Sequence, residues 1–99
     1  MIIARHINTV KEGRLEEFVE FARWWNQKFP PPRAGRLYRP IEGAPSNVII
    51  GDDEFENRAE WDRHAERVHS DPGFESAIAK FQELLDDSKF ELWEVVELK

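Results

Sequence analysis

The sequence predicts an α+β domain in which a four-stranded antiparallel sheet carries helices on one face. Three observations predict this class. Short β-branched runs stand near both ends and in the middle of the 99-residue chain, amphipathic stretches separate them, and proline or glycine clusters mark the boundaries. A chain of this length has room for one domain with one hydrophobic core. We therefore expect residues 1–99 to form a single domain.

The first strand and the first helix are predicted from the N-terminal third of the chain. Residues 2–8 (IIARHIN) are short and β-branched, which is typical of a strand. Thr9 and Glu12 have the spacing of a capping box, so we expect a helix to start near Val10. The run Pro30-Pro31-Pro32 ends that helix, because proline cannot continue the hydrogen-bond ladder. Its apolar face is expected to contain Leu15, Phe18, Val19, Ala22, Trp25 and Phe29.

Two further strands are predicted in the middle of the chain. Residues 35–42 and 46–55 are strand-like and are joined by Gly43-Ala44-Pro45. Pro40 indicates that the first of these strands is an edge strand or is cut short, because proline donates no ladder hydrogen bond. We interpret the acidic run 52–54 as a solvated strand end, since it lacks the glycine and the spacing of a calcium loop.

The last third of the chain predicts a broken helix and a closing strand. Asn57 with Glu60 resembles a helix cap, residues 70–73 interrupt the helical pattern, and Phe74 begins a second apolar stripe. The run 90–98 (FELWEVVEL) is predicted to form the fourth strand. The order is β-α-β-β-α-β, the ferredoxin-like split βαβ arrangement. The fourth strand is apolar on both faces, which predicts that helices cover one face and a partner sheet the other.

Composition excludes several classes of function. A net charge of −6 argues against nucleic acid or an anionic membrane as the main partner. The chain has no cysteine, which excludes disulfides, a thiol nucleophile and a zinc–thiolate site. Nothing in it resembles a signal peptide or a membrane span, so we expect a cytoplasmic protein. Four tryptophans and seven phenylalanines in so short a chain favour an interface or a ligand wall beside the core.

Three segments resemble a known superfamily. They are residues 11–18 (KEGRLEEF), 55–61 (FENRAEW) and 70–74 (SDPGF). With the element order, they resemble the dimeric α/β barrel proteins, which include the NIPSNAP family and the antibiotic biosynthesis monooxygenases. The resemblance implies a homodimer whose two sheets pack face to face as a barrel. It also implies that each subunit has its own pocket between sheet and helices.

The resemblance draws attention to His64 as a candidate catalytic residue. Helical spacing places His64 beside Trp61 on the edge of an apolar stripe, so its side chain is expected to face the sheet. A histidine there could take a proton near neutral pH or hydrogen-bond a substrate oxygen. The structural alternative is a boundary histidine tied to a carbonyl or a carboxylate. Haem-degrading and quinone-forming members of the superfamily use an Asn–Trp–His or Asn–Trp–Tyr type of constellation, and this chain departs from that pattern because Asn8 stands at the very end of the first strand.

Other residues are candidates for binding the substrate. His6 shares a strand face with Asn8, and that face could look at the helices or at a partner sheet. Trp61 is expected to be a core anchor that also forms a pocket wall. Arg36 and Tyr38 share a face of the second strand and could bind a carboxylate or a phenol, although surface positions are the alternative.

No metal site and no resident cofactor are expected. His64 and His69 stand five residues apart, whereas two metal ligands on one helix face are typically four apart, and no third ligand follows at helical spacing. The chain also lacks a phosphate-binding glycine loop, a serine elbow and a dinucleotide fingerprint. Haem binding, with His64 as axial ligand, is a further alternative.

Two hypotheses of function follow. The first is a protein that binds a bulky aromatic small molecule between sheet and helices, with cofactor-independent monooxygenation as the implied activity. The protein would deprotonate and hold a phenolic or enolic substrate, whose own electrons activate oxygen. The second is a non-catalytic homodimeric binding or stress-associated module whose pocket its own side chains fill. Analogy of fold carries the first hypothesis.

Overall fold

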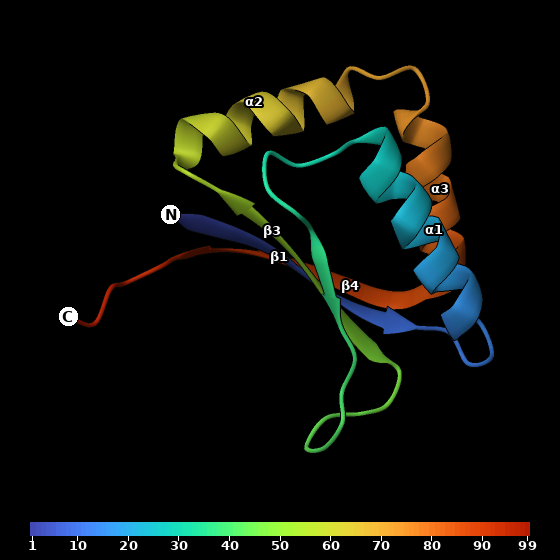
Figure 1. Ribbon diagram of the computed structural model, residues 1–99. Helices are drawn as coiled ribbons and strands as arrows, with labels where there is room; N and C mark the ends of the chain where they lie inside the picture. Colours follow the sequence, from blue (N-terminus) through green and yellow to red (C-terminus); the bar gives the residue numbers. More distant parts are fainter.

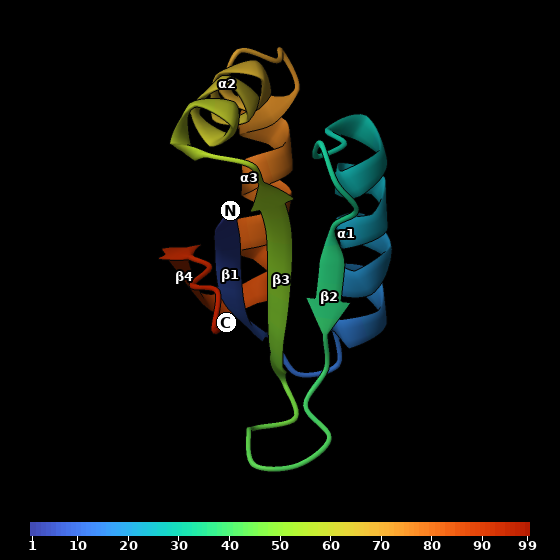
Figure 2. The ribbon, with the colours of Figure 1, turned by 60° about the vertical axis from the view of Figure 1, so that its left-hand side comes forward.

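The computed structural model describes residues 1–99 and contains a four-stranded antiparallel sheet with three helices on one face (Figure 1). The strand order is β2-β3-β1-β4, so the first strand is central and the short second strand lies at an edge (Figure 2). The α+β, ferredoxin-like layout is therefore confirmed, with the second helix divided in two. The elements are β1 (Ile2–Val10), α1 (Leu15–Lys28), β2 (Arg36–Tyr38), β3 (Val48–Phe55), α2 (Arg58–His69), α3 (Phe74–Leu84) and β4 (Leu85–Glu94).

The first helix begins later than the sequence predicts. Thr9 does not cap a helix, because it continues β1 and pairs with Val48 on one side and Asp87 on the other. Pairing with two neighbours outweighs a local cap, which satisfies only one backbone donor. The chain then turns at Gly13, whose φ of +77° is a conformation that glycine adopts readily. Helix α1 therefore starts at Leu15 instead of near Val10.

The fourth strand is also shifted from its expected position. It runs over Leu85–Glu94 instead of 90–98, because Leu85 is already extended where α3 ends. The polar residues Asp87, Ser88 and Lys89 pair with the far end of β1, which their hydrophilic character does not suggest. Beyond Glu94 the chain leaves the sheet after one hydrogen bond from the Val95 amide to the Met1 carbonyl. The C-terminal tail then extends away from the domain (Figure 1).

The register of the strands defines the two faces of the sheet. Even-numbered residues of β1 face the helices, and Ala4, Asn8 and Val10 are buried there. The odd-numbered residues of β1 form the outer face, where Arg5 makes a two-pronged ion pair with Asp52 at 2.8 Å in both contacts. No helix covers the outer face (Figure 2).

Aromatic side chains join α1 and α3. Phe81 of α3 meets Phe21 with ring centroids 4.6 Å apart and Trp25 with centroids 5.1 Å apart, both edge to face. A buried cluster then connects these helices to the sheet, and it consists of Val10, Phe18, Ile49 and Leu84. Each such side chain contributes about 1.5–3 kcal/mol on burial, so this cluster fixes one end of the helical layer on the sheet.

Helix α2 lies across the other end of the sheet (Figure 1). Its predicted cap is confirmed, because Asn57 Oδ1 accepts a hydrogen bond of 2.9 Å from the Glu60 amide. No helix of the structure is both long enough and apolar enough to cross a membrane.

Candidate functional site

A cavity of about 1070 Å³ lies between the sheet and the helices α1 and α3. Ligand sites typically have volumes of roughly 300–1000 Å³, so this cavity can hold a molecule with several rings. Its helical wall is largely apolar and aromatic, whereas the sheet contributes mainly polar side chains. The helical wall includes Phe18, Val19, Trp25, Phe29, Ile78 and Phe81, and the sheet contributes His6, Asn8, Asp53 and Ser88 among others.

Asn8 lies at the floor of the cavity and is only 5% exposed. The Ser88 hydroxyl of β4 donates a hydrogen bond of 3.0 Å to Asn8 Oδ1, since the two residues are direct partners across β1 and β4. This bond fixes the amide and leaves Asn8 able to donate with its NH2 group. Of the Asn–Trp–His type of constellation, only Asn8 lines the cavity.

His6 faces the same cavity from the middle of β1. Its partner on β3 is Gly51, which has no side chain, so the imidazole is uncovered on that side. Its partner on β4 is Phe90, whose ring centroid is 4.9 Å away. The surrounding protein lowers the pKa of His6 by desolvation, although the charge of Asp52 acts in the opposite direction. The imidazole is therefore neutral at pH 7 and can accept a proton or a hydrogen bond.

The Asp53 side chain faces the cavity from β3 and forms no hydrogen bond or ion pair with another side chain or with the backbone. It stands beside Asp52, which points to the outer face and is paired with Arg5. Desolvation, followed by the charge of Asp52, raises the pKa of Asp53 to about 6. An unpaired carboxylate in a cavity with a pKa near the working pH is suited to general acid–base chemistry.

Charged residues also border the cavity. Basic residues come from the side of α1 and β2, where Arg39 forms an ion pair of 3.4 Å with Glu16. Acidic residues come from the start of β4. The basic group is Arg23, Arg36 and Arg39, and the acidic group is Asp86 and Asp87.

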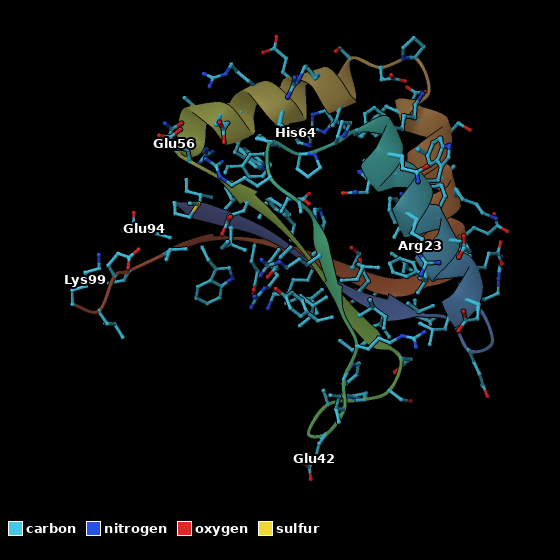
Figure 3. All side chains as sticks on the ribbon, viewed as in Figure 1. Arg23, Glu42, Glu56, His64, Glu94 and Lys99 are labelled. Carbon is cyan, nitrogen blue, oxygen red and sulfur yellow. The ribbon has the colours of Figure 1, made fainter.

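The structure places His64 outside this cavity. Its side chain packs against Phe55, with ring centroids 5.3 Å apart, and the residue is 9% exposed. Figure 3 labels His64 on α2, the helix that crosses one end of the sheet. Desolvation, helped by the nearby Arg67 charge, lowers the pKa of His64. His64 is thus a buried, neutral residue between a helix and a strand, and it is not brought together with His6 or Asn8.

The remaining candidates divide between the two faces of the sheet. Trp61 stacks on Phe90 at a centroid distance of 5.8 Å and does not line the cavity. Arg36 is the direct partner of Asp52 and therefore shares the outer face with Tyr38, although the residue also borders the cavity at the edge strand. Tyr38 is the direct partner of Ile50 and lies with it on the outer face, so it cannot contact a ligand in the cavity.

Asp53, Asn26 and Trp25 line the cavity, although none of them is a site residue predicted from the sequence. The signal for Asp53 was available, because the strand alternation that places Ile49 and Phe55 on the helical face places Asp53 there too. We interpreted its acidic run, residues 52–54, as a solvated strand end, and this is wrong at two positions: Asp52 is buried and paired with Arg5, and Asp53 faces the cavity. Asn26 carries no comparable signal, since its approach depends on how α1 is placed over the sheet.

The chain is similar in fold to several solved structures. One is an uncharacterized NIPSNAP domain protein from Burkholderia xenovorans, with a TM-score of 0.75, 13% identity and coverage of 97% of this chain and 95% of that one. A NIPSNAP family protein from Agrobacterium tumefaciens has a TM-score of 0.77 at 12% identity, with 99% and 88% covered. An antibiotic biosynthesis monooxygenase has a TM-score of 0.70 at 16% identity, with 98% and 100% covered.

These similarities define the class of protein by its fold. The chain has the fold of the NIPSNAP-domain and antibiotic biosynthesis monooxygenase-like proteins, and the resemblance drawn from its sequence is confirmed at that level. The sequence itself matches no protein-family model and no curated protein.

His64 is not placed to act as the axial ligand of a haem in this cavity. An axial ligand must face the space that holds the porphyrin, and His64 is packed against Phe55 instead. No group of three or more histidine, aspartate or glutamate side chains is arranged to hold a metal ion.

Proposed function

We propose that the protein binds a bulky aromatic small molecule that carries a hydroxyl group, in the cavity between the sheet and the helices α1 and α3. The observation that carries this proposal is the contrast between the two cavity walls. Aromatic rings of α1 and α3 face polar side chains of β1 and β3 across a volume of about 1070 Å³. An apolar ring system is stabilised by the helical wall, while a few polar groups on the sheet orient it.

The cavity favours this hypothesis over that of a closed module. A module whose pocket is filled by its own side chains would leave no volume of this size. The Trp25 indole borders the cavity and is held by Phe29 at a centroid distance of 4.8 Å and by Phe81 at 5.1 Å. The rings are therefore fixed before a ligand arrives, which reduces the entropy lost on binding.

We propose cofactor-independent monooxygenation as the activity. The protein would remove a proton from a phenolic or enolic substrate, and the resulting anion would supply electrons to O2. For a methylene carbon next to the ring, one oxygen atom becomes a carbonyl and the other leaves as water with the two hydrogens of that carbon. The solved structure named as an antibiotic biosynthesis monooxygenase supports this choice by analogy of fold.

We also propose that the protein is a homodimer. A cytoplasmic location remains a prediction from the sequence. The outer face of the sheet carries Ile7 and Ile50 as direct partners, and Trp93 on the same face is 53% exposed. The tail adds Val96, which is 70% exposed. Apolar area of this kind is stabilised when a second sheet covers it.

Quenching of tryptophan fluorescence tests the proposed binding site. We expect 1,8-dihydroxyanthraquinone to quench wild-type fluorescence saturably at micromolar concentration, because Trp25 borders the cavity. The Trp25→Phe variant should lose most of the quenching. The matched control is Trp93→Phe, which removes an indole from the outer face and should keep it. Absence of saturable quenching in the wild type would refute the proposed binding site.

Oxygen uptake tests the proposed activity separately. With 1,8-dihydroxyanthrone as substrate, uptake should exceed the uncatalysed rate and should fall in variants of the cavity. Ligand binding without extra oxygen uptake would support the proposed binding function alone. It would rule out monooxygenation of this substrate class.

A further inference from the structure

Two adjacent aspartates of β3 have opposite environments. Asp52 points to the outer face and is paired with Arg5 through two contacts of 2.8 Å. Asp53 points to the cavity, opposite the small side chain of Ala4, and no cation of the chain is paired with it. A half-buried carboxylate without a counter-ion is costly for folding, so its presence on a cavity wall calls for an explanation in terms of ligand binding.

Gly35 shows where the Asp53 carboxylate lies. A Cβ placed on Gly35 would be 2.7 Å from Asp53 Oδ1 and also 2.7 Å from Asn26 Oδ1. The two oxygens come from β3 and α1, and they converge on the same side of this glycine. They lie no farther apart than twice that distance, so a single donor group can reach both. All three residues line the cavity.

From this geometry we propose that Asp53 accepts the hydroxyl proton of the aromatic ligand and that Asn26 positions the same hydroxyl. The assignment rests on the proposed function of the cavity. It identifies the ligand group that the polar side chains of the sheet recognise. Two converging acceptor oxygens are complementary to a donor, so the ligand group that binds there is a phenolic or enolic hydroxyl and not an ether or a ketone.

The proton transfer is a simple exchange between two oxygens. The ligand O–H bond breaks, its hydrogen forms a bond to a carboxylate oxygen of Asp53, and the electron pair stays on the ligand as a phenolate or enolate. Asn26 can then present its NH2 group to the new oxyanion by rotation of its amide. The pKa of about 6, caused mainly by desolvation, keeps Asp53 ionised at neutral pH and makes it a stronger base than an exposed aspartate.

Calorimetric titration with a matched pair of ligands tests the proposal. The probes are 1-naphthol and 1-methoxynaphthalene, which have similar ring systems but differ in whether the oxygen can donate a hydrogen bond. For the wild type we expect 1-naphthol to bind at least about tenfold more tightly, as is typical of a hydrogen bond to a charged acceptor. In Asp53→Asn this preference should fall to about twofold or less, while 1-methoxynaphthalene binds as before.

Two controls keep the test decisive. Asp86→Asn removes a carboxylate from another part of the cavity lining, on the same side of β4 as Ser88, and should keep the preference. Gly35→Ala retains the Asp53 carboxylate but displaces both oxygens, so it should reduce the preference as Asp53→Asn does. Equal reductions in Asp53→Asn and Asp86→Asn would show a general effect of charge and overturn the assignment.

The outcomes distinguish a failure of the Asp53 assignment from a failure of the proposed function on which it rests. If neither naphthalene binds the wild type, the proposed function fails. If 1-naphthol keeps its full preference in Asp53→Asn, the cavity binds ligands but Asp53 is not the acceptor. A wild-type preference for 1-naphthylamine over 1-naphthol would overturn the hydroxyl as the recognised group.

Discussion

Trp61 of α2 stacks on Phe90 of β4, with ring centroids 5.8 Å apart and ring planes inclined by 23°. The opposite neighbour of Phe90 is His6, at 4.9 Å. This contact anchors α2 to the sheet next to the cavity without placing Trp61 in the cavity lining. Trp61 therefore has the anchoring role expected from the sequence, whereas its expected role as a pocket wall is not seen in this geometry.

Truncation of Trp61 should affect stability more than ligand binding. We expect Trp61→Ala to lower the free energy of unfolding by about 2 kcal/mol, because the side chain is large but only partly buried. Trp61→Phe should recover about half of that loss, since a smaller ring can still stack on Phe90. Urea denaturation measures both values. A loss below about 0.5 kcal/mol in Trp61→Ala would show that the stack does not anchor α2.

Replacement of His64 distinguishes the sequence-based hypothesis from the structural one. His64 packs on Phe55, so His64→Ala should lower the free energy of unfolding by about 1–2 kcal/mol and change ligand affinity by less than twofold. Thermal or urea denaturation measures the free energy of unfolding, and calorimetry measures the ligand affinity. A tenfold loss of affinity with unchanged stability would restore His64 to the binding site.

The pH dependence of stability should show the unusual environment of Asp53. Its pKa in the folded protein is about 6, against an ordinary value of 3.8, so the folded state holds this proton more tightly than the unfolded state does. The contribution of Asp53 to stability is therefore present below about pH 4 and is lost as the pH rises through about 6. The charge of Asp52 raises the pKa of Asp53 further. His6 also faces the cavity, and desolvation lowers its pKa below the ordinary value of 6.5, so it is neutral at neutral and alkaline pH.

Asp53→Asn should consequently stabilise the protein at neutral and alkaline pH. We expect a gain of about 1–2 kcal/mol near pH 8, reduced from the full shift because the carboxylate is only half-buried. Near pH 4 the gain should vanish. Urea denaturation at the two pH values provides the measurement, and a variant that is less stable than the wild type at pH 8 would contradict the placement of Asp53.

A charge on the outer face should dissociate the proposed dimer. Ile7→Asp places a carboxylate beside Ile50 in the middle of the face that a second sheet would cover. We expect sedimentation equilibrium to show a dimer for the wild type and a monomer for this variant. The matched control is Ile41→Asp, because Ile41 is fully exposed in the loop between β2 and β3. A wild-type monomer at micromolar concentration would exclude the homodimer.

The fold could be predicted because its main signals are independent of distant contacts. The β-branched runs of β1 and β3, the proline run after α1 and Pro40 beside the edge strand act locally. The errors came where tertiary pairing overrode local patterns. Thr9 entered a strand despite its capping spacing, and the polar start of β4 paired with β1 because an adjacent strand was present.

The site was predicted less completely than the fold. The alternation of β1 placed His6 and Asn8 on one face, and only the position of the helices decided that this face borders a cavity. His64 attracted attention through its residue type and the resemblance, yet the path of α2 directs it to Phe55. Asn26 and Asp53 both lie close to Gly35, which has no side chain to exclude them. No sequence pattern predicts that these residues come together.

Amide NMR of the labelled protein during titration with 1-naphthol tests the central claim most directly. The account predicts that the largest and saturable shift changes fall on residues that border the cavity, namely His6, Asn26 and Asp53. It also predicts small changes for Ile7 and Tyr38 on the outer face. Changes centred on the outer face, or on α2 around His64, would contradict a ligand site between the sheet and the helices α1 and α3.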